Sequence, residues 1–291
     1  MRIIENRKKF FALSLILIII GFASMFYQAS KGNGMLNWDV EFTGGTAIEI
    51  DMGEAFDHEQ LRGIIDKVTG QNSPQIQDII GTNEVQVKIQ SIDSETRGKL
   101  SEAIKAEFLS SDIKSIKDVS GTVSSEMQKA AMKAILVACI AMLIYISIRF
   151  KDIRAGGSAI IALLHDVLLV IVAYAIFRIP VNNAFIAVLL TILGYSVNAT
   201  IVIFDRVREN HNRFSKHQTA EKIDKSIAQT LARSINTSIT TFFTVGAIYA
   251  IGVQSIKEIA LPMMVGIIVG AYSSICISGS IWYSLLPKRD K

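Results

Sequence analysis

Six long runs of apolar residues, separated by charged segments, constrain the fold of this 291-residue chain more than any other feature. A helix needs about 20 mainly apolar residues to cross roughly 30 Å of bilayer hydrocarbon. Spans are expected near residues 9–28, 130–149, 156–177, 183–204, 236–254 and 260–286. Half of the residues are hydrophobic although 19% are charged, so the two kinds must be segregated. The sequence therefore predicts a polytopic α-helical membrane protein with six transmembrane helices.

The first apolar run has a basic flank and could be mistaken for a secretory signal peptide. It extends from Phe10 to Phe26, which exceeds the usual hydrophobic region of a signal, and no A-x-A-like cleavage site follows it. We therefore expect an uncleaved membrane anchor. Cys139 and Cys276 both lie within apolar runs, so no disulfide framework is expected.

Basic residues orient the predicted spans, because cytoplasmic loops are enriched in Lys and Arg. They gather in the N-terminus, in the 149–154 and 205–235 loops and at the C-terminal end. Residues 30–128 instead hold 9 basic and 17 acidic residues, a net charge of −8 within a chain of +4. The N- and C-termini are thus predicted to be cytoplasmic and the acidic segment extracytoplasmic. The basic balance reflects membrane topology, so no nucleic-acid partner is expected.

These assignments divide the chain into four parts. They are a cytoplasmic N-terminus with the first span (1–28), an extracytoplasmic α+β domain (29–129), a five-helix transmembrane block (130–286) and a cytoplasmic tail (287–291). Within the block, the 205–235 loop is amphipathic between Thr219 and Ser234. That segment predicts a helix lying in the cytoplasmic membrane interface.

Hydrophobic periodicity in the soluble segment alternates between the strand and helix patterns. Strand, helix, strand, strand, helix and strand are expected over 39–51, 58–68, 75–80, 84–90, 94–109 and 113–119. This order is that of a ferredoxin-like α+β domain. Gly44-Gly45 interrupts the first strand and predicts a bulge or a close backbone approach. Asp57 and Gly70 are expected to cap the first helix, and Gly81-Thr82-Asn83 to form a hairpin turn.

The soluble segment carries no Cys/His cluster, phosphate loop or nucleophile constellation. We therefore expect no bound metal, no cofactor and no enzymatic activity. A small domain that binds a partner, or is moved by one, agrees better with this sequence.

The third predicted span contains His165-Asp166 about ten residues from its cytoplasmic end. Ionisable residues at membrane depth are costly and suggest a functional site. Buried polar residues also join neighbouring helices by hydrogen bonds, so a purely structural role stays open. The fourth span has a polar cluster of Ser196, Asn198 and Thr200, which allows close helix approach or lines a wet path.

The fifth span begins with Arg233 and carries a polar stripe. Steps of three and four residues place its members on one helix face; they are Asn236, Thr237, Thr240, Thr241 and Thr244. Arg233 is either functional or merely extended toward the lipid headgroups. In the sixth span, Gly266 and Gly270 have the small-xxx-small spacing of a helix-packing face.

Several segments resemble the SecF family of bacterial protein-export membrane subunits. The fourth-span segment Gly194-Tyr-Ser-Val-Asn198-Ala-Thr-Ile-Val-Ile-Phe204-Asp-Arg-Val-Arg-Glu-Asn210 is similar to the family signature. The resemblance continues in Glu41-Phe42-Thr-Gly44-Gly45-Thr46, Tyr145–Phe150, His165-Asp166, Ser226–Thr241 and Gly266–Ser274. Its motif positions include Asp205, Arg206, Arg208, Asn210, Asn236, Thr237 and Thr240.

This resemblance implies a role in the bacterial inner membrane. Members of the family pair with SecD, work beside the SecYEG channel and use an ion gradient to pull unfolded secretory polypeptide outward at a late stage of export. Membrane lipid is the remaining expected partner. The family's relay couples a fourth-span aspartate to a fifth-span arginine, which Arg233 matches.

The family aspartate is replaced by Ala199 in this chain, and a methyl group cannot titrate. Three explanations stay open. An acid of the partner subunit can act alone, with Arg233 biasing its protonation; Asp166 can replace the missing group; or Asn198, Ser196 and Thr200 can coordinate sodium beside the partner's carboxylate. The first needs no new chemistry in this chain and is the preferred hypothesis.

Two other functions remain. One is half of a small-molecule or lipid exporter of the same resistance-nodulation-division superfamily, and the other is a translocon scaffold that couples no energy. Small-molecule and lipid exporters of this superfamily usually carry two six-span repeats on one chain, whereas this sequence has one. Ala199 gives the scaffold hypothesis its support.

Overall fold

The structure is a computed structural model that describes residues 2–31, 34–54, 56–71, 74–79, 82–150, 153–215 and 218–287. The chain folds into two compact units. The helical unit comprises Met1–Asn37 and Lys133–Lys291, and the α+β unit comprises Trp38–Met132. The basic residues Lys151, Lys216, Lys288, Arg289 and Lys291 lie outside the described residues.

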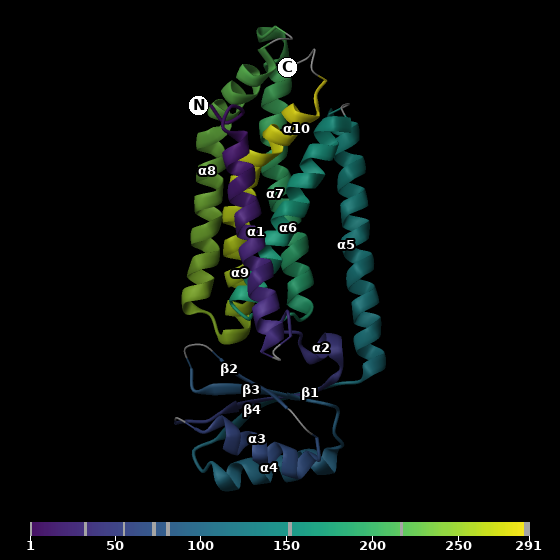
Figure 1. The fold of residues 1–291 in the computed structure, drawn as a ribbon, viewed down its shortest axis with the longest axis vertical. Coiled ribbons are helices and arrows are strands. Elements are labelled where there is room, and N and C mark those ends of the chain that lie inside the picture. The colour runs from purple at the N-terminus through teal and green to yellow at the C-terminus, as the bar shows by residue number, and fades with distance from the viewer. Residues whose placement is uncertain are drawn as a thin grey trace. The chain divides into compact units, whose positions relative to one another are not determined.

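Six apolar helices in the described part of the chain are long enough to cross a membrane, which confirms that prediction. The first five are α1 (Arg7–Ser30), α5 (Gly121–Phe150), α6 (Ile153–Ile176), α7 (Asn183–Glu209) and α8 (Thr219–Ile251) (Figure 1). The sixth is α9 (Gln254–Tyr272), which continues through a π-helical turn, Ser273–Ser278, into α10 (Gly279–Leu285). Cys139 and Cys276 are both free thiols.

Glycines set how closely these helices pack. A Cβ atom added at Gly266 of α9 would lie 2.2 Å from Cδ1 of Ile192 on α7, and one added at Gly270 would lie 3.2 Å from Cβ of Ser196. The predicted small-xxx-small packing face is therefore confirmed. A second close approach was not expected from the sequence: a Cβ at Gly21 of α1 would lie 2.1 Å from Cγ2 of Val172 on α6.

The amphipathic segment 219–234 is the first part of α8 and continues into the fifth span without a break. Its apolar residues Ile223 and Ile227 are fully buried against Ile3, Ile4 and the end of α7. Backbone N–H groups of Ile3 and Ile4 also donate to Asp224 Oδ1, at 3.0 and 3.1 Å. The prediction of an interfacial helix is thus wrong, because protein rather than lipid covers the apolar face. The connection between α7 and α8 is short and contains the 3₁₀ turn His211–Arg213.

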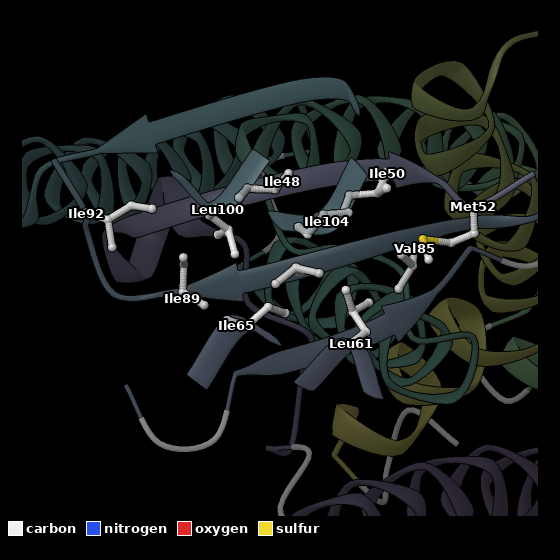
Figure 2. Close-up of a cluster of buried hydrophobic side chains, with 11 residues drawn as sticks. Ile48, Ile50, Met52, Leu61, Ile65, Val85, Ile89, Ile92, Leu100 and Ile104 are labelled. Carbon is white, nitrogen blue, oxygen red and sulfur yellow. The ribbon is translucent and has the colours of Figure 1, made fainter. Parts of the chain in front are cut away.

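The α+β unit contains the six elements in the expected order. They are β1 (Gly45–Asp51), α3 (His58–Thr69), β2 (Gln75–Asp78), β3 (Glu84–Ile89), α4 (Ser94–Glu107) and β4 (Asp112–Val119). The strands form one antiparallel sheet in the order β2-β3-β1-β4. Figure 2 shows its core, in which Ile48 of β1, Leu61 of α3 and Leu100 and Ile104 of α4 are fully buried.

The expected strand over 39–51 is correct only from Gly45 onward. Val40–Thr43 instead forms a short helix, α2, in which Phe42 is buried and its carbonyl accepts a hydrogen bond from Gln128 Nε2. Gly44 and Gly45 have φ angles of 73° and 119°, which disfavour any side chain. A Cβ at Gly45 would also lie 2.4 Å from the carbonyl oxygen of Ile89. The predicted close backbone approach is therefore confirmed.

Capping residues delimit the two helices of this unit. Asp57 accepts a hydrogen bond from the Glu59 N–H at 2.9 Å, and Gly70 ends α3 in the left-handed conformation, as expected. Asp93 caps α4, and its bonds with Thr96 hold the pKa of the Asp93 carboxyl below its usual value. Gly81 of the predicted hairpin turn lies outside the described residues.

Candidate functional site

Asp166 is the centre of a buried polar cluster in the helical unit. It lies in α6 and is 0% exposed. Its Oδ2 atom accepts hydrogen bonds from Ser196 Oγ of α7 at 2.5 Å and from Ser273 Oγ at 2.7 Å. Its Oδ1 atom lies 2.9 Å from His165 Nδ1. A carboxyl group with three polar neighbours from three segments is satisfied although it is shielded from solvent.

His165 extends the cluster from α6 to α1 and α9. Its Nε2 atom lies 2.9 Å from Ser14 Oγ of α1. Ser14 Oγ lies 3.2 Å from the Tyr272 hydroxyl, which donates to the backbone carbonyl of Phe10 at 2.8 Å. A continuous row of polar atoms thus connects Asp166 with the backbone of α1. We call Phe10 O, Tyr272, Ser14, His165 and Asp166, in this order, the polar row.

The π-helical turn Ser273–Ser278 supplies a second part of the cluster. Ser274 Oγ lies 3.0 Å from Thr200 Oγ1 and donates to the Ser196 carbonyl at 3.3 Å. A π turn widens the helix and often marks a functional site. Here it accompanies two adjacent serines, Ser273 and Ser274, that both contact other helices.

The structure thus brings together four of the residues selected from the sequence: His165, Asp166, Ser196 and Thr200. Ser14, Tyr272, Ser273 and Ser274 were not selected. Two adjacent serines in an apolar span were a detectable signal for Ser273 and Ser274. Ser14 and Tyr272 carry hydroxyl groups like those of other residues in their spans, and no periodicity distinguishes them.

Arg233 and its stripe lie elsewhere. Arg233, Asn236, Thr237 and Thr240 of α8 are all exposed, as is Asn198 of α7. Within the described part of the chain, Arg233 makes no hydrogen bond or ion pair. The hydroxyls of Thr240, Thr241 and Thr244 donate to carbonyls of their own helix; Thr240 Oγ1, for example, donates to the Asn236 carbonyl at 3.0 Å. This stripe is therefore a polar surface on the isolated chain.

The two sets of residues do not form one site. Ser196 and Thr200 share a buried face of α7, whereas Asn198 lies between them in sequence and on the exposed side. Their oxygens do not converge, which argues against the sodium site considered for Ser196, Asn198 and Thr200. Gly194 is exposed on α7, and Ala199 is half-buried.

The remaining fourth-span motif residues fix the connection between α7 and α8. Asp205 pairs with Arg149 of α5 at 2.8 Å and with Arg208 at 3.4 Å. Arg206 Nε donates to Gln229 Oε1 of α8 at 2.6 Å.

Asn210 completes this connection. It is 1% exposed and donates to Ser226 Oγ and Gln229 Oε1, both at 2.8 Å. Together with Asp205 and Arg206, it holds the end of α7 against α5 and α8 by specific contacts rather than by charge alone.

The family model for the C-terminal region of SecD/SecF protein-export membrane proteins matches residues 99–288. Protein translocase subunit SecF of Vibrio alginolyticus is 36% identical, over 96% of this chain and 88% of its own length. The chain belongs to the SecD/SecF family. SecF of Haemophilus influenzae is 33% identical, over 98% of this chain and 86% of its own length.

The SecF-type fold is also present in solved structures. The crystal structure of SecDF from Thermus thermophilus, a translocon-associated membrane protein, matches with a TM-score of 0.86 at 30% identity. The match covers 98% of this chain and 38% of the SecDF chain. A super-membrane-facing form of SecDF matches with a TM-score of 0.68 at 29% identity. This SecF-family chain therefore corresponds to a minor part of the longer SecDF polypeptides.

Proposed function

We propose that this multi-pass membrane protein is the SecF subunit of a protein-export complex. It pairs with SecD, works beside SecYEG and helps an ion gradient pull secretory polypeptide across the membrane late in export. Family membership and the names of the relatives support the export role. The similarity to SecDF, a translocon-associated protein, supports the translocon context.

The exposed polar stripe of α8 is the main structural support for a SecD partner. The outer faces of α1 and α5 expose bulky apolar side chains such as Leu15 (58% exposed) and Val137 (65% exposed), which suit lipid. Arg233 does not suit lipid, because a charge in hydrocarbon is costly unless it is paired. A second helical block that covers this stripe would shield Arg233 from lipid. In the SecF family that partner is SecD.

Because Ala199 replaces the family's aspartate, the acidic residue of the ion relay must come from another position. No carboxylate of the described residues contacts Arg233, and Ala199 cannot provide one. We infer that an acidic residue of SecD faces Arg233 and that the arginine favours its ionised form. The coupling step is then shared between the two subunits.

Charge distribution supports an orientation with both termini in the cytoplasm of a bacterial cell. Ile3, Ile4 and Phe10 pack near Trp282 and Tyr283 of α10, and Arg7 lies 5.2 Å from the Tyr283 ring centroid. Both ends of the chain are therefore on one side of the helical unit (Figure 1). The end of α5 with Arg149, the end of α7 with Asp205 and the start of α8 with Asp224 lie on this side as well, which agrees with the positive-inside rule for an inner-membrane protein.

The α+β unit is then extracytoplasmic, and its strand order agrees with a ferredoxin-like domain. We propose that it contacts the emerging unfolded polypeptide and performs no catalysis. In the described residues no group of three potential metal ligands occurs, and the proposed role needs neither a metal nor a cofactor. Lipid is the remaining partner, and nucleic acid has no part in this role.

An export assay tests this function. Cells depleted of the chain should export a secretory precursor slowly, and complementation should restore the rate only while the ion gradient is intact. SecD and SecYEG subunits should also copurify with the chain. If the stimulation of export survives an uncoupler, the chain is a passive scaffold. If SecD does not copurify and depletion leaves export unaffected, the proposal fails and the small-molecule or lipid exporter is the better explanation.

A further inference from the structure

The side chains of the polar row have few protons to donate, so the direction of one hydrogen bond determines the direction of the next. Each hydroxyl has one proton to donate, and a neutral imidazole has one N–H and one acceptor nitrogen. Tyr272 donates its proton to the Phe10 carbonyl, so Ser14 must donate to the Tyr272 oxygen. Ser14 then has no second proton, and His165 Nε2 must carry the hydrogen of the Ser14 contact.

With Nε2 protonated, one further proton must lie between His165 Nδ1 and Asp166 Oδ1, which are 2.9 Å apart. It resides on Asp166, giving a neutral acid beside a neutral imidazole, or on His165, giving an imidazolium beside a carboxylate. Without it, two lone pairs would face each other at hydrogen-bonding distance. The arrangement in the structure therefore corresponds to a pair with no net charge and one proton in the Nδ1–Oδ1 bond.

Loss of that proton forces a change along the whole row. The pair becomes negative by one charge, and the remaining ring proton must move to Nδ1 to face the carboxylate. His165 Nε2 then needs a proton from Ser14, which can no longer donate to Tyr272. Tyr272 either turns its hydroxyl to Ser14 and releases Phe10, or keeps Phe10 and loses Ser14. One of its two hydrogen bonds to α1 is lost in both cases.

We propose that His165 and Asp166 form a proton-binding site carried entirely by this chain, whose occupancy is transmitted to the α1–α9 contact through Ser14 and Tyr272. On release, the N–H or O–H bond between the two side chains breaks and the proton passes to water. No oxidant, reductant or metal takes part. The inference rests on the proposed function for its purpose, because it adds a second ion-binding group to a gradient-coupled complex.

The hydrogen-bond geometry favours a proton over a metal cation. Both carboxylate oxygens of Asp166 already face donors: the hydroxyls of Ser196 and Ser273 at Oδ2 and the imidazole at Oδ1. A sodium ion would have to displace these donors to reach a lone pair. The same donors stabilise the ionised form of Asp166 after release, which a buried carboxylate requires.

Few other titratable groups face the pair. Among the described residues, His165 is the titratable side chain that contacts Asp166 directly. From α9, the ring centroid of Tyr272 lies 6.1 Å from that of His165, and Cys276 of the π turn lies near Tyr272. The contacts from α1 and α7 are the uncharged Ser14 and Ser196. The site therefore responds to proton concentration without a neighbouring fixed charge.

Infrared difference spectroscopy on the full chain in lipid vesicles tests this site without SecD or export. We expect a pH-dependent carboxyl signal that is absent in Asp166→Asn and retained in Asp205→Asn, a control that removes a partly exposed carboxyl paired with Arg149. Ser196→Ala removes a donor to the carboxylate and should raise the titration midpoint by about one pH unit or less. Tyr272→Phe removes a group that favours the protonated arrangement and should lower it by a similar amount.

These opposite shifts distinguish a proton site from a structural role, which would not move the midpoint in a defined direction. A signal that persists in Asp166→Asn, or that follows sodium rather than pH, would overturn the inference. Should Asp166→Asn fail to fold, the titration midpoints of Ser196→Ala and Tyr272→Phe still test the proton site, because equal or reversed shifts would contradict it. If the chain shows the Asp166 signal but does not assist export, the proton site is supported and the proposed function is contradicted.

In the export assay, Asp166→Asn should lose gradient-driven stimulation and Asp166→Glu should restore part of it. Ser278→Ala is the matched control, because Ser278 is buried in the same π turn but donates to the Ser274 carbonyl of its own helix instead of to Asp166. Equal losses from Asp166→Asn and Ser278→Ala would indicate a general packing effect and contradict a specific proton site.

Discussion

Replacement of Arg233 by leucine is expected to reduce gradient-driven export by more than about hundredfold while the chain stays folded. Removing one partner of a buried ion pair costs about 3–5 kcal/mol, and 1.36 kcal/mol corresponds to a factor of ten. Arg233 is exposed on the isolated chain and bonds to no residue that the structure describes. Its contribution should therefore appear only in the complex with SecD.

Two variants control this result. Arg233→Lys keeps the charge and should retain part of the activity, whereas Lys225→Leu removes another exposed cation of α8 and should have little effect. Export kinetics in membrane vesicles, with and without the gradient, measure the difference. Loss of the folded chain in Arg233→Leu, or an equal defect in Lys225→Leu, would show that Arg233 is a structural or topological residue instead.

The second large effect is expected from Gly266→Val. A Cβ at this position would lie 2.2 Å from Cδ1 and 3.1 Å from Cγ2 of Ile192, so α7 and α9 must move apart. Overpacking of this kind costs about 1–3 kcal/mol or more. Thermal unfolding of the purified chain in detergent measures the loss of stability.

The double variant with Ile192→Ala identifies the cause, because removing the contacted atoms should restore part of the loss. Gly157→Ala is the control: beyond the adjoining residues and backbone of its own helix, no atom lies within 4 Å of a Cβ added there, and alanine favours a helix over glycine by about 1 kcal/mol. Equal unfolding temperatures for Gly266→Val and Gly157→Ala would show that the α7–α9 contact is looser than described.

Strong periodic signals allowed much of the fold to be predicted. The six apolar spans, the helix capped by Asp57 and Gly70, and the strand pattern of the α+β unit all follow from local residue chemistry. Val40–Thr43 was predicted incorrectly because a four-residue helix has no periodicity, and its end depends on the φ angle of Gly44. The 219–234 segment was misplaced because an apolar face indicates burial but does not say whether lipid or protein covers it.

The candidate site was predictable only in part. His165 and Asp166 were detectable because charge is rare in an apolar span, and Arg233 because it leads a polar stripe. Their separation into a buried cluster and an exposed surface depends on which helices are neighbours. Ser14 and Tyr272 could not be found, since one hydroxyl group in a span has many possible partners until α1, α6 and α9 are packed together.

The central claim is that α8 presents its polar stripe to SecD. A photo-crosslinking residue at Thr237, on the stripe, should yield an adduct with SecD in intact membranes. The same residue at Val137, which is 65% exposed on the apolar face of α5, should yield none. Adducts from position 137 without adducts from position 237 would contradict the account.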